Sequence, residues 1–553
     1  MNVRLRTTLA VAPRLSAIAR RRVLSCLLSA VGTSLVAACS FAPSYKVPET
    51  TATASYKEAN SSGAEASQPV DVGNWSGAEP ADTTARGPWW TRFNDPTLNQ
   101  LEDQAHAANQ NLAAAAARYR EARAAADIAG TDLFPILSAG ASGTRERVSK
   151  YAPTNTTGAP HTGGDFILRA QTSYELDFWG RVRNGIAAER SRAQASAADL
   201  ATAQLSIESE LAGDYFELRG LDAQVDLLSR TVESYREALR ITTNRYQGGV
   251  SAAVDVDQAT TQLETAQVQL ADTQLSRAQL EHAIAILIGS PPSNFTLAPA
   301  NLDVTPPGIT PGLPSQLLQR RPDVASAERS VFAANAEIGV TRAAWFPTFT
   351  LDGDFGFESV HTGNWIEAPA RMWSIGPSAV LTIFDAGLRR AQNQQSVAAF
   401  DESVANYRQT VLSAYAQVED QLAAIRWLDQ QLASQDRAVA SSQRALDQSN
   451  YRYKGGIVTF LEVVTAQNAA LQAQQAALNL RVRRLNASLQ LIKALGGDWT
   501  PAQLDHPIEV ASQPAAATST AQVPASASVP APTSTTPPSA DDVAATAAAP
   551  TAP

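Results

Sequence analysis

The sequence predicts a mixed α and β fold made by tandem duplication of one unit, and three observations support this prediction. Landmark segments recur in the same order, with an offset of 207 residues between the two halves. Each half contains a pair of short alternating segments with the length of β-strands. Each half also contains a proline-free segment long enough for a helix of about 65 residues.

The duplication is carried by four landmarks that occur twice. Three of them share the offset of 207 residues, and the fourth is offset by 212. The landmarks are Phe134-Pro135 and Phe346-Pro347, Gly180 and Gly387, Gly248-Gly249 and Gly455-Gly456, and the helix-ending glycines Gly289 and Gly496. We therefore expect a first structural repeat over residues 88–300 and a second over residues 301–512.

Each repeat is expected to begin with a helix that ends at the Phe-Pro pair, because proline restrains the residue before it and cannot continue a helix. Two extended segments follow, rich in Phe, Ile, Leu, Val and Thr and separated by a loop of Gly, Thr, Asn and Pro, which predicts a β-hairpin. The expected helices are 113–131 and 324–342, and the expected strands are 136–145, 166–177, 348–358 and 373–384.

A long helix and a shorter returning helix complete each repeat. The long helices, 181–245 and 388–452, would be rods of about 95 Å at 1.5 Å per residue. The double glycines turn the chain, and the returning helices are expected over 254–288 and 461–495. The second of these carries apolar residues at the alternating spacing of a coiled-coil seam, namely Leu478, Val482, Leu485, Leu489 and Ile492.

The two ends of the chain have distinct compositions. Residues 1–38 contain six arginines, no acid and an apolar run, which is typical of a signal peptide. The sequence "VAAC" ending at Cys39 resembles a bacterial lipobox, which implies lipid attachment at Cys39; an ordinary signal-peptidase site that contains a cysteine is the alternative. Ser40 at the next position indicates the outer membrane as destination. We expect a lipidated tether over 39–87 and a disordered tail of Ala, Pro, Ser and Thr over 513–553.

Charge and residue usage argue against several classes of function. The formal net charge of −9 becomes −15 once the six arginines of the signal peptide are removed (−9 − 6). Such an acidic chain is a poor binder of nucleic acid. The 5 histidines are dispersed, and no phosphate-binding loop, nucleophile elbow or dinucleotide fingerprint is present. We expect no metal, no cofactor and no enzymatic activity.

The expected strands are long enough to cross a bilayer when tilted, which predicts a membrane protein. Four strands per chain are too few to close a barrel. Open strand edges cannot lie in hydrocarbon, because each unpaired backbone N–H or C=O group costs several kcal/mol there. Several chains must therefore share one barrel if the strands are transmembrane. The long polar helices also need neighbours, so a shared helical tube is part of the same prediction.

Seven motifs in register resemble the outer-membrane factor (TolC-like) family, in its NodT/OprM-type lipoprotein group. They are "CSFAPSYKVP", "WWTRFNDPTLNQLEDQA", "QRRPDVASAER", the "FP" pairs, "ELDFWGRVR", "RYKGGI" and "ALGG", between residues 39 and 499. The resemblance implies a homotrimer that forms a 12-stranded β-barrel on a periplasmic α-helical barrel. It also implies a lipid-anchored outer-membrane exit duct for drugs or other small molecules, with a periplasmic adaptor and an RND-type inner-membrane pump as partners.

The resemblance places the two glycine corners at the periplasmic tip, where relatives meet the adaptor. Glycine also permits the positive φ angles of a tight helix reversal, so turn geometry alone can explain these residues. The expected adaptor-contact residues are Tyr246, Gly248, Gly249, Val250, Tyr453, Gly455, Gly456 and Ile457.

The residues just after the corners are the expected periplasmic gate. In a trimer an acid here becomes a ring of three like charges that favours cations. A solvated helix start, where acids favour the helix dipole, is the alternative. Relatives carry an aspartate and an arginine where this chain has Thr465 and Asn468, so an aspartate-arginine latch is not expected. The gate residues are predicted to be Asp255, Asp257, Leu461, Glu462 and Thr465.

Two other functions remain open from the sequence. One is a TolC-like duct of a type I protein secretion system. The other is a structural coiled-coil lipoprotein, which would explain the helices but not the paired hairpins. Outside the corners, Trp89 and Trp90 are expected to anchor a segment against the helices, and Pro322 and Asp323 to start a helix.

Overall fold

The computed structural model describes residues 40–50, 56–60, 88–151, 159, 161–308 and 320–504. The chain divides into two units, 1–511 and 512–553. The second unit lies outside the described residues, and so do the expected signal peptide, Cys39 and most of the expected tether. Everything below concerns the first unit.

The helices of the two repeats have matching bounds. Helix α4 (Gln110–Thr131) lies 212 residues before α8 (Pro322–Ala343) at both ends. The long helix α5 (Arg181–Gln247) and the returning helix α6 (Ala253–Leu287) lie 207 residues before α9 (Leu388–Lys454) and α10 (Phe460–Ala494). The predicted duplication and the predicted long helices are therefore confirmed. Further elements are α2 (Lys57–Asn60), η1 (Trp89–Phe93), α3 (Pro96–Ala108), η2 (Pro292–Asn294), η3 (Thr362–Asn364), η4 (Ala368–Ala370) and η5 (Pro501–Leu504).

Local sequence explains where the shorter helices begin. The carboxylate of Asp95 caps α3 by accepting hydrogen bonds from the backbone N–H groups of Thr97 (2.8 Å) and Leu98 (3.2 Å). Asn109 caps α4 in the same way through the N–H of Leu112, at 3.0 Å. Helix α8 begins with Pro322 at its first position and Asp323 in its first turn, as predicted.

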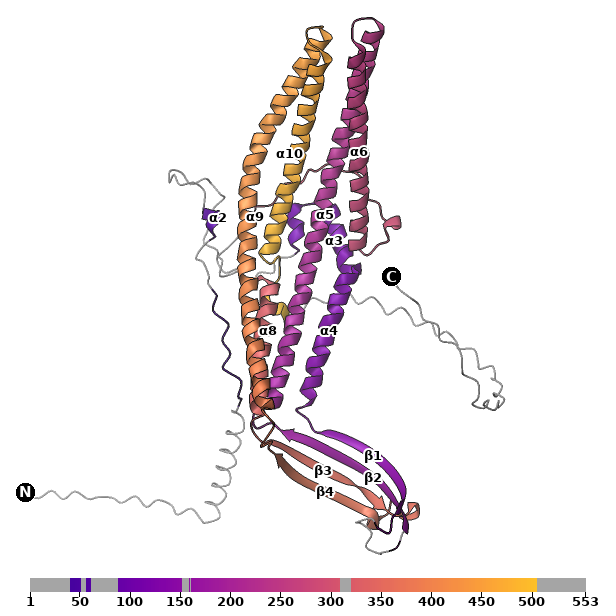
Figure 1. Cartoon of the computed structure of the whole chain (residues 1–553), viewed down its shortest axis with the longest axis vertical. Helices are drawn as coiled ribbons and strands as arrows, with labels where there is room; N and C mark the ends of the chain where they lie inside the picture. The colour runs from indigo at the N-terminus through magenta and orange to yellow at the C-terminus, as the bar shows by residue number, and fades with distance from the viewer. Residues whose placement is uncertain are drawn as a thin grey trace, which may run out of the picture. The chain divides into compact units, whose positions relative to one another are not determined.

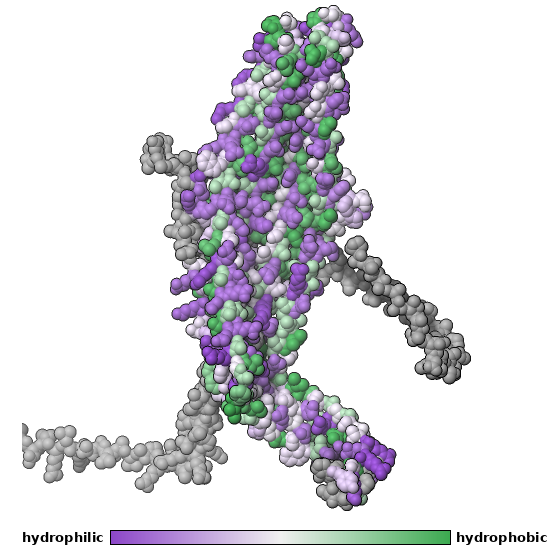
Figure 2. Space-filling view, in the orientation of Figure 1, coloured by the Kyte–Doolittle hydropathy of each residue, from purple (hydrophilic) through white to green (hydrophobic). Residues whose placement is uncertain are grey.

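The long helices pack side by side, both with the helices next to them in the chain and with helices that are distant in sequence (Figure 1). Helix α5 contacts α4, α6 and α8, helix α9 contacts α8 and α10, and α10 also contacts α5. One buried cluster joins η1, α3, α5, α6 and α10, and a second joins α8, α9 and α10. On the face drawn in Figure 2, polar residues cover most of the helical surface, and apolar residues gather where the helices meet the strands.

The predicted seam of α10 is buried along its later half. Leu485, Leu489 and Ile492 lie in the first cluster with Trp89 and Phe216. Trp89 and Trp90 are both buried in this cluster, so they anchor η1 against the helices as predicted. These contacts tie the beginning of the first repeat to the end of the second.

The N-terminal residues that the structure describes contact mainly the second repeat. The Phe41 ring stacks on that of Phe346 with centroids 4.4 Å apart. Further along, the Asn335 side chain donates a hydrogen bond to the Pro43 carbonyl at 2.9 Å. The backbone N–H groups of Lys57 and Glu58 donate to the carboxylate of Glu419 on α9, at 2.7 and 3.0 Å.

Four antiparallel strands form one sheet in the order β1-β2-β3-β4, with β1 (Ile136–Val148), β2 (His161–Leu176), β3 (Thr348–Ser359) and β4 (Arg371–Val380). The prediction that the fourth strand extends to Phe384 is wrong. Val380 pairs with Thr348, the first residue of β3, and Pro347 before it has no N–H to donate. Residues beyond Val380 therefore have no neighbouring strand to pair with. Strands β1 and β2 are longer than predicted, because Val148 pairs with His161.

The sheet has one apolar face and one polar face. Residues paired across strands share a face, and the pairs Leu168–Phe357, Tyr174–Leu351 and Phe355–Trp373 lie on one side. The opposite side carries Ser138, Arg169, Gln171, Ser173, Glu175, Thr350, Asp352, Asp354, Ser374 and Ser378. Hydrogen bonds cross this polar side from Ser173 to Asp352 (2.7 Å) and from Ser374 to Asp354 (2.9 Å).

A buried ion-pair network holds the segment between the two repeats. The carboxylate of Asp222 accepts hydrogen bonds from Arg219 (2.9 Å) and Arg277 (2.7 Å). The same arginines donate to the carbonyl oxygens of Ala298 (2.8 Å) and Leu297 (2.6 Å) in that segment. Because buried charges need partners, this network fixes the path of the connecting chain across α5 and α6.

Candidate functional site

The two glycine corners are Schellman motifs at the ends of α5 and α9. In the first, the N–H of Val250 donates to the carbonyl of Arg245 (2.8 Å) and the N–H of Gly249 to that of Tyr246 (2.9 Å). The second corner repeats both bonds, from Ile457 to Arg452 (2.9 Å) and from Gly456 to Tyr453 (3.0 Å). The geometry is therefore duplicated along with the sequence.

The two glycines of each corner are not equivalent. Gly249 and Gly456 have φ of +74° and +73°, in the left-handed region that favours glycine. Gly248 and Gly455 have φ of −80° and −75°, which other residues adopt without strain. The requirement for glycine applies to the second position of each pair.

Apolar side chains are exposed at both corners. Tyr246 and Val250 are 49% and 69% exposed at the first corner, and Ile457 is 71% exposed at the second. Single exposed apolar residues are common, but here they gather on two adjoining turns. Both corners therefore present a partly apolar surface at the ends of their helical hairpins.

Tyr453, by contrast, points into the helices and is only 7% exposed. Its ring packs on Phe460, with centroids 5.4 Å apart, and beneath the guanidinium of Arg245, at 4.9 Å. Its hydroxyl lies 3.4 Å from that of Thr242 on α5. Tyr453 thus joins the ends of α5 and α9 instead of presenting its side chain at the surface.

The acids after the corners differ in their surroundings. Asp255 is half-buried, and the hydroxyl of Ser251 donates to its carboxylate at 2.6 Å. Asp257 is exposed. Glu462 forms an ion pair with Arg452 across the second corner at 2.7 Å. Asp255 and Glu462, which occupy equivalent positions in the two repeats, are thus both engaged in local contacts at a helix start.

The other two predicted gate residues are exposed on α10. Leu461 is exposed, and Thr465 bonds back to the Leu461 carbonyl at 2.9 Å, as is usual for threonine in a helix. One turn further, Gln262 of α6 donates a hydrogen bond to Asn468 of α10. Sequence reasoning placed Asn468 where relatives have an arginine, but it did not find this bond between the two returning helices.

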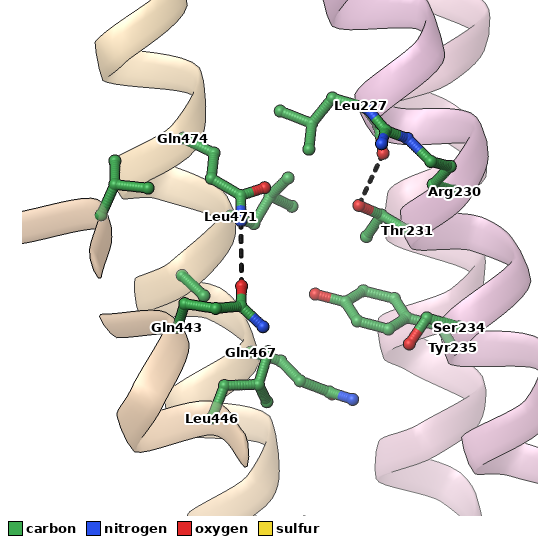
Figure 3. A pocket seen from close by; sticks show the side chains of 12 residues that line it. Leu227, Arg230, Thr231, Ser234, Tyr235, Gln443, Leu446, Gln467, Leu471 and Gln474 are labelled. Atoms are coloured by element: carbon green, nitrogen blue, oxygen red, sulfur yellow. Dashed lines mark hydrogen bonds between the residues drawn. The ribbon is translucent and has the colours of Figure 1, made fainter. Parts of the chain in front are cut away.

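Further from the corners, a groove runs between α5 and the pair α9 and α10 (Figure 3). Tyr235 projects into it from α5, opposite Gln467 and Leu471 of α10. Gln474 donates to Gln443 at 3.1 Å along the other wall. The lining mixes amide, hydroxyl and aliphatic groups, without a cluster of charges or of nucleophiles.

Two further polar sites were not found from the sequence. His106 pairs with Glu208 (3.0 Å), which also accepts the indole N–H of Trp89 (2.7 Å). Arg321 does more than flank a helix start, because it donates to the Ala494 carbonyl of α10 at 3.0 Å. Their partners are more than 100 residues away in sequence, so local patterns carry no sign of them.

Within the described residues, no group of three or more His, Cys, Asp or Glu side chains is placed to hold a metal ion. In the same part of the chain, none of the helices is both long and apolar enough to cross a membrane.

Comparison with known proteins gives one family. The family model described as outer membrane efflux protein matches residues 101–290 and 313–497. The chain is 34% identical over 415 residues to the pyoverdine export outer membrane protein OpmQ of Pseudomonas aeruginosa, covering 74% of this chain and 87% of that one. It is 32% identical over 480 residues to the toluene efflux pump outer membrane protein TtgC of Pseudomonas putida, covering 86% and 96%.

The fold is also similar to that of solved structures. The outer-membrane channel OprN superposes with a TM-score of 0.75 at 30% identity, covering 83% of this chain and 99% of that chain.

Proposed function

Because this chain belongs to the outer membrane efflux protein family and serves as an exit duct across the outer membrane, we propose that it works as a passive homotrimeric channel. Three copies would contribute four strands each to one 12-stranded barrel, and their helices to a periplasmic tube. The substrates we propose are drugs or other small molecules, since the relatives are named for export of pyoverdine and toluene.

The observation that carries this proposal is the two-faced sheet. One face is apolar and includes exposed Phe355, Trp373 and Ile375, and the other bears carboxylates, amides and hydroxyls. Among the described residues, the long helices make their main contacts with one another and not with either face of the sheet. Alternation of apolar and polar residues along each strand is what a barrel with a lipid-facing outside and a watery inside requires.

The sheet edges support assembly from several copies. Strand β1 pairs only with β2, and β4 pairs only with β3, among the described residues. Each outer edge therefore has a row of backbone groups without a strand partner. Such edges cannot face lipid, so β4 of one copy would pair with β1 of the next until the barrel closes.

We also propose that the glycine corners meet a periplasmic adaptor, and through it an RND-type inner-membrane pump. The exposed side chains of Tyr246, Val250 and Ile457 are suited to such a contact, whereas buried Tyr453 would act by holding the corner in shape. Gly248, Gly249, Gly455 and Gly456 would act through backbone geometry. The gate would lie just beyond, with Asp257 and Leu461 exposed there and Asp255, Glu462 and Thr465 within the same two turns.

For the membrane anchor we propose a lipid on Cys39. That residue lies outside the described part, but its neighbours are held close to the strands. The Ser40 hydroxyl donates to Asn184 at 3.0 Å, and Phe41 packs on Phe346 beside Trp179. A lipid at position 39 would therefore begin where the helices meet the sheet.

The test is a purified, detergent-extracted preparation studied by native mass spectrometry and in planar lipid bilayers. We expect a trimer that produces stepwise ion conductance. A monomer that forms no conductance would overturn the channel proposal. Deletion of the gene distinguishes the substrate class: efflux predicts raised susceptibility to dyes, detergents and antibiotics, whereas loss of one secreted protein without that change would indicate a type I secretion duct.

A further inference from the structure

The apolar face of the sheet carries positive charge at one end only. Because residues paired across strands share a face, the register assigns each strand residue to one of the two faces. On the apolar face, the charged residues of the four strands are Arg145, Arg147 and Arg371. The first two come late in β1, which follows α4, and Arg371 begins β4, so all three lie at the end far from the helices. On the face drawn in Figure 2, hydrophilic residues gather at this end of the strands.

The acids near the same strand ends lie on the opposite face. Glu146, Asp165 and Glu358 fall on the polar side by the same register, and the strands place no acid on the apolar side. The three arginines of the apolar face are exposed. No ion pair joins any of them to another side chain in the described part of the chain. Their positive charge is therefore not compensated on this face.

Aromatic side chains lie next to these arginines on the apolar face. The Phe166 ring covers its pairing partner Gly143, since a Cβ added to that glycine would lie 2.9 Å from the ring. Trp365, in the loop between β3 and β4, packs on the same ring with centroids 5.9 Å apart. Trp373 follows Arg371 by two residues on β4 and is 70% exposed. Aromatic rings of this kind gather at the boundary between hydrocarbon and headgroups in membrane proteins.

The spacing along β1 places Arg145 at the height of lipid headgroups. Arg145 lies nine residues beyond Ile136, the first residue of β1. At about 3.4 Å per residue and a tilt of about 40°, this distance rises about 23 Å along the membrane normal. The apolar band of outer-membrane barrels is about 25 Å tall, and a lipid-facing arginine is costly at its middle but tolerated near its boundary. The guanidinium groups would therefore lie among headgroups, above an apolar face that contacts acyl chains.

We propose that Arg145, Arg147 and Arg371 bind the phosphate groups of an outer-leaflet lipid, whose acyl chains lie on the apolar strands below. Guanidinium groups bind phosphate through paired N–H donors. The apolar face beneath them selects a phosphate that is attached to acyl chains over a free one. If β4 of one copy pairs with β1 of the next, Arg371 comes beside the β1 arginines of that neighbour. This inference rests on the proposed homotrimeric barrel, and it names the lipid chemistry that the outer surface of the barrel recognises.

Native mass spectrometry of the detergent-extracted protein with added lipid A tests the site. The parent protein should bind lipid A that carries both phosphates about fivefold more tightly than lipid A from which one phosphate has been removed. Inorganic phosphate at the same concentration as the lipid should not displace it, because it lacks acyl chains. Both measurements use the parent protein, so they do not depend on the folding of any variant.

Substitutions then test the named arginines. Arg145→Gln should weaken binding of the doubly phosphorylated lipid about fivefold, and the same change at Arg145, Arg147 and Arg371 together about a hundredfold. Lysine at the three positions should retain most of the affinity, because it keeps the charge. The matched control is Arg169→Gln, since Arg169 is exposed on the polar face of β2, and it should leave the affinity unchanged. Circular dichroism verifies that each variant is folded.

The lipid site is overturned if the parent binds both forms of lipid A equally, or if the folded triple glutamine variant binds as tightly as the parent. Displacement of the lipid by inorganic phosphate would overturn it as well, because the site would then recognise a free anion. These outcomes are separable from failure of the channel proposal. If the parent is a monomer without conductance, the barrel and the lipid site fail together. If it is a conducting trimer without preference for the phosphates, the channel stands and only the lipid site is wrong.

Discussion

Glu102 on α3 is a buried carboxyl without a hydrogen-bond partner in the described structure. Burial, reinforced by the negative charges of Glu208 and Asp103, raises the pKa of Glu102 to about 10. It is therefore a neutral acid at pH 7. Nearby His106 pairs with Glu208, and this partner raises the pKa of the imidazole despite its burial. Five dispersed histidines gave no hint in the sequence that one of them enters a buried cluster.

We predict that the group formed by Glu102, His106 and Glu208 makes the protein less stable as pH rises. Glu102 ionises near its ordinary pKa of 4.5 when unfolded but only near 10 when folded, so the folded state holds the extra proton between those values. The free energy of unfolding then falls with pH by about 1.4 kcal/mol per unit in that window. The stability from His106 acts in the same direction, because it is present below its ordinary pKa and lost above the raised one.

Glu102→Gln should remove the larger part of this dependence, since glutamine keeps the shape of the neutral acid. Thermal unfolding at pH 5 and pH 8 measures it: the variant should unfold at a higher temperature than the parent at pH 8, with a smaller difference at pH 5. Glu121→Gln, the same substitution at an exposed position of α4, is the control, because Glu121 is not among the charges that act on Glu102 or His106. Equal pH slopes in parent and Glu102→Gln would contradict the prediction.

At the scale of the element, the two glycines of each corner differ in backbone conformation, although nothing in the sequence distinguishes them. Both glycines of "QGG" and "KGG" read as turn residues, yet only Gly249 and Gly456 have positive φ. The αL conformation costs a residue with a Cβ about 1–2 kcal/mol, whereas the first glycine of each pair has ordinary backbone angles. The sequence thus located each corner, and the backbone angles identify the glycine that the corner needs.

Gly249→Ala should therefore lower the free energy of unfolding of the first hairpin by about 1 kcal/mol. Gly248→Ala is the matched control and should change stability little or raise it, because alanine is the better helix former. Hydrogen exchange of the amides in α5 and α6 near the corner measures the local effect. Equal loss of protection in both variants would show that backbone conformation is not what distinguishes the two glycines.

At the scale of the whole molecule, the same ion pair occurs in both repeats, with a buried aspartate in the first and an exposed aspartate in the second. Asp222 and Arg277 of the first repeat correspond to Asp429 and Arg484 of the second, and each pair is bonded, at 2.7 and 2.6 Å. The Asp222 side chain is 2% exposed and that of Asp429 is 55% exposed. The first pair also holds the segment between the repeats, because the backbone N–H of Ala300 donates to Asp222 at 3.1 Å.

We predict a large difference between two chemically identical substitutions. Asp222→Ala leaves Arg219 and Arg277 buried without their carboxylate and should lower the free energy of unfolding by about 3–5 kcal/mol. Asp429→Ala breaks a solvent-exposed pair and should cost about 0–1 kcal/mol. Denaturant unfolding followed by circular dichroism measures both. Similar losses for the two variants would mean that burial does not determine how much this ion pair contributes to the free energy of unfolding.

Periodicity and turn chemistry alone were enough to predict the duplicated helices and their glycine corners, because these depend on residues that are near one another in the chain. The ends of the strands could not be predicted in this way. Strand β4 stops at Val380 because β3 begins at Thr348, which is a property of the pairing and not of residues 381–384. The alternation of Phe, Leu and Ile with Asp, Ser and Thr indicated strands, but only the register brought them onto common faces.

What the sequence by itself determined is the repeat, its helices and hairpins, the corner positions and the resemblance that led to the family. Only the tertiary structure decided that Tyr453 packs inward, that Gln262 bonds Asn468, and that His106 and Glu102 share a buried cluster with Glu208. The physical reason is that local conformation follows from steric and hydrogen-bond preferences of neighbouring residues, whereas burial and charge pairing depend on contacts between segments up to several hundred residues apart.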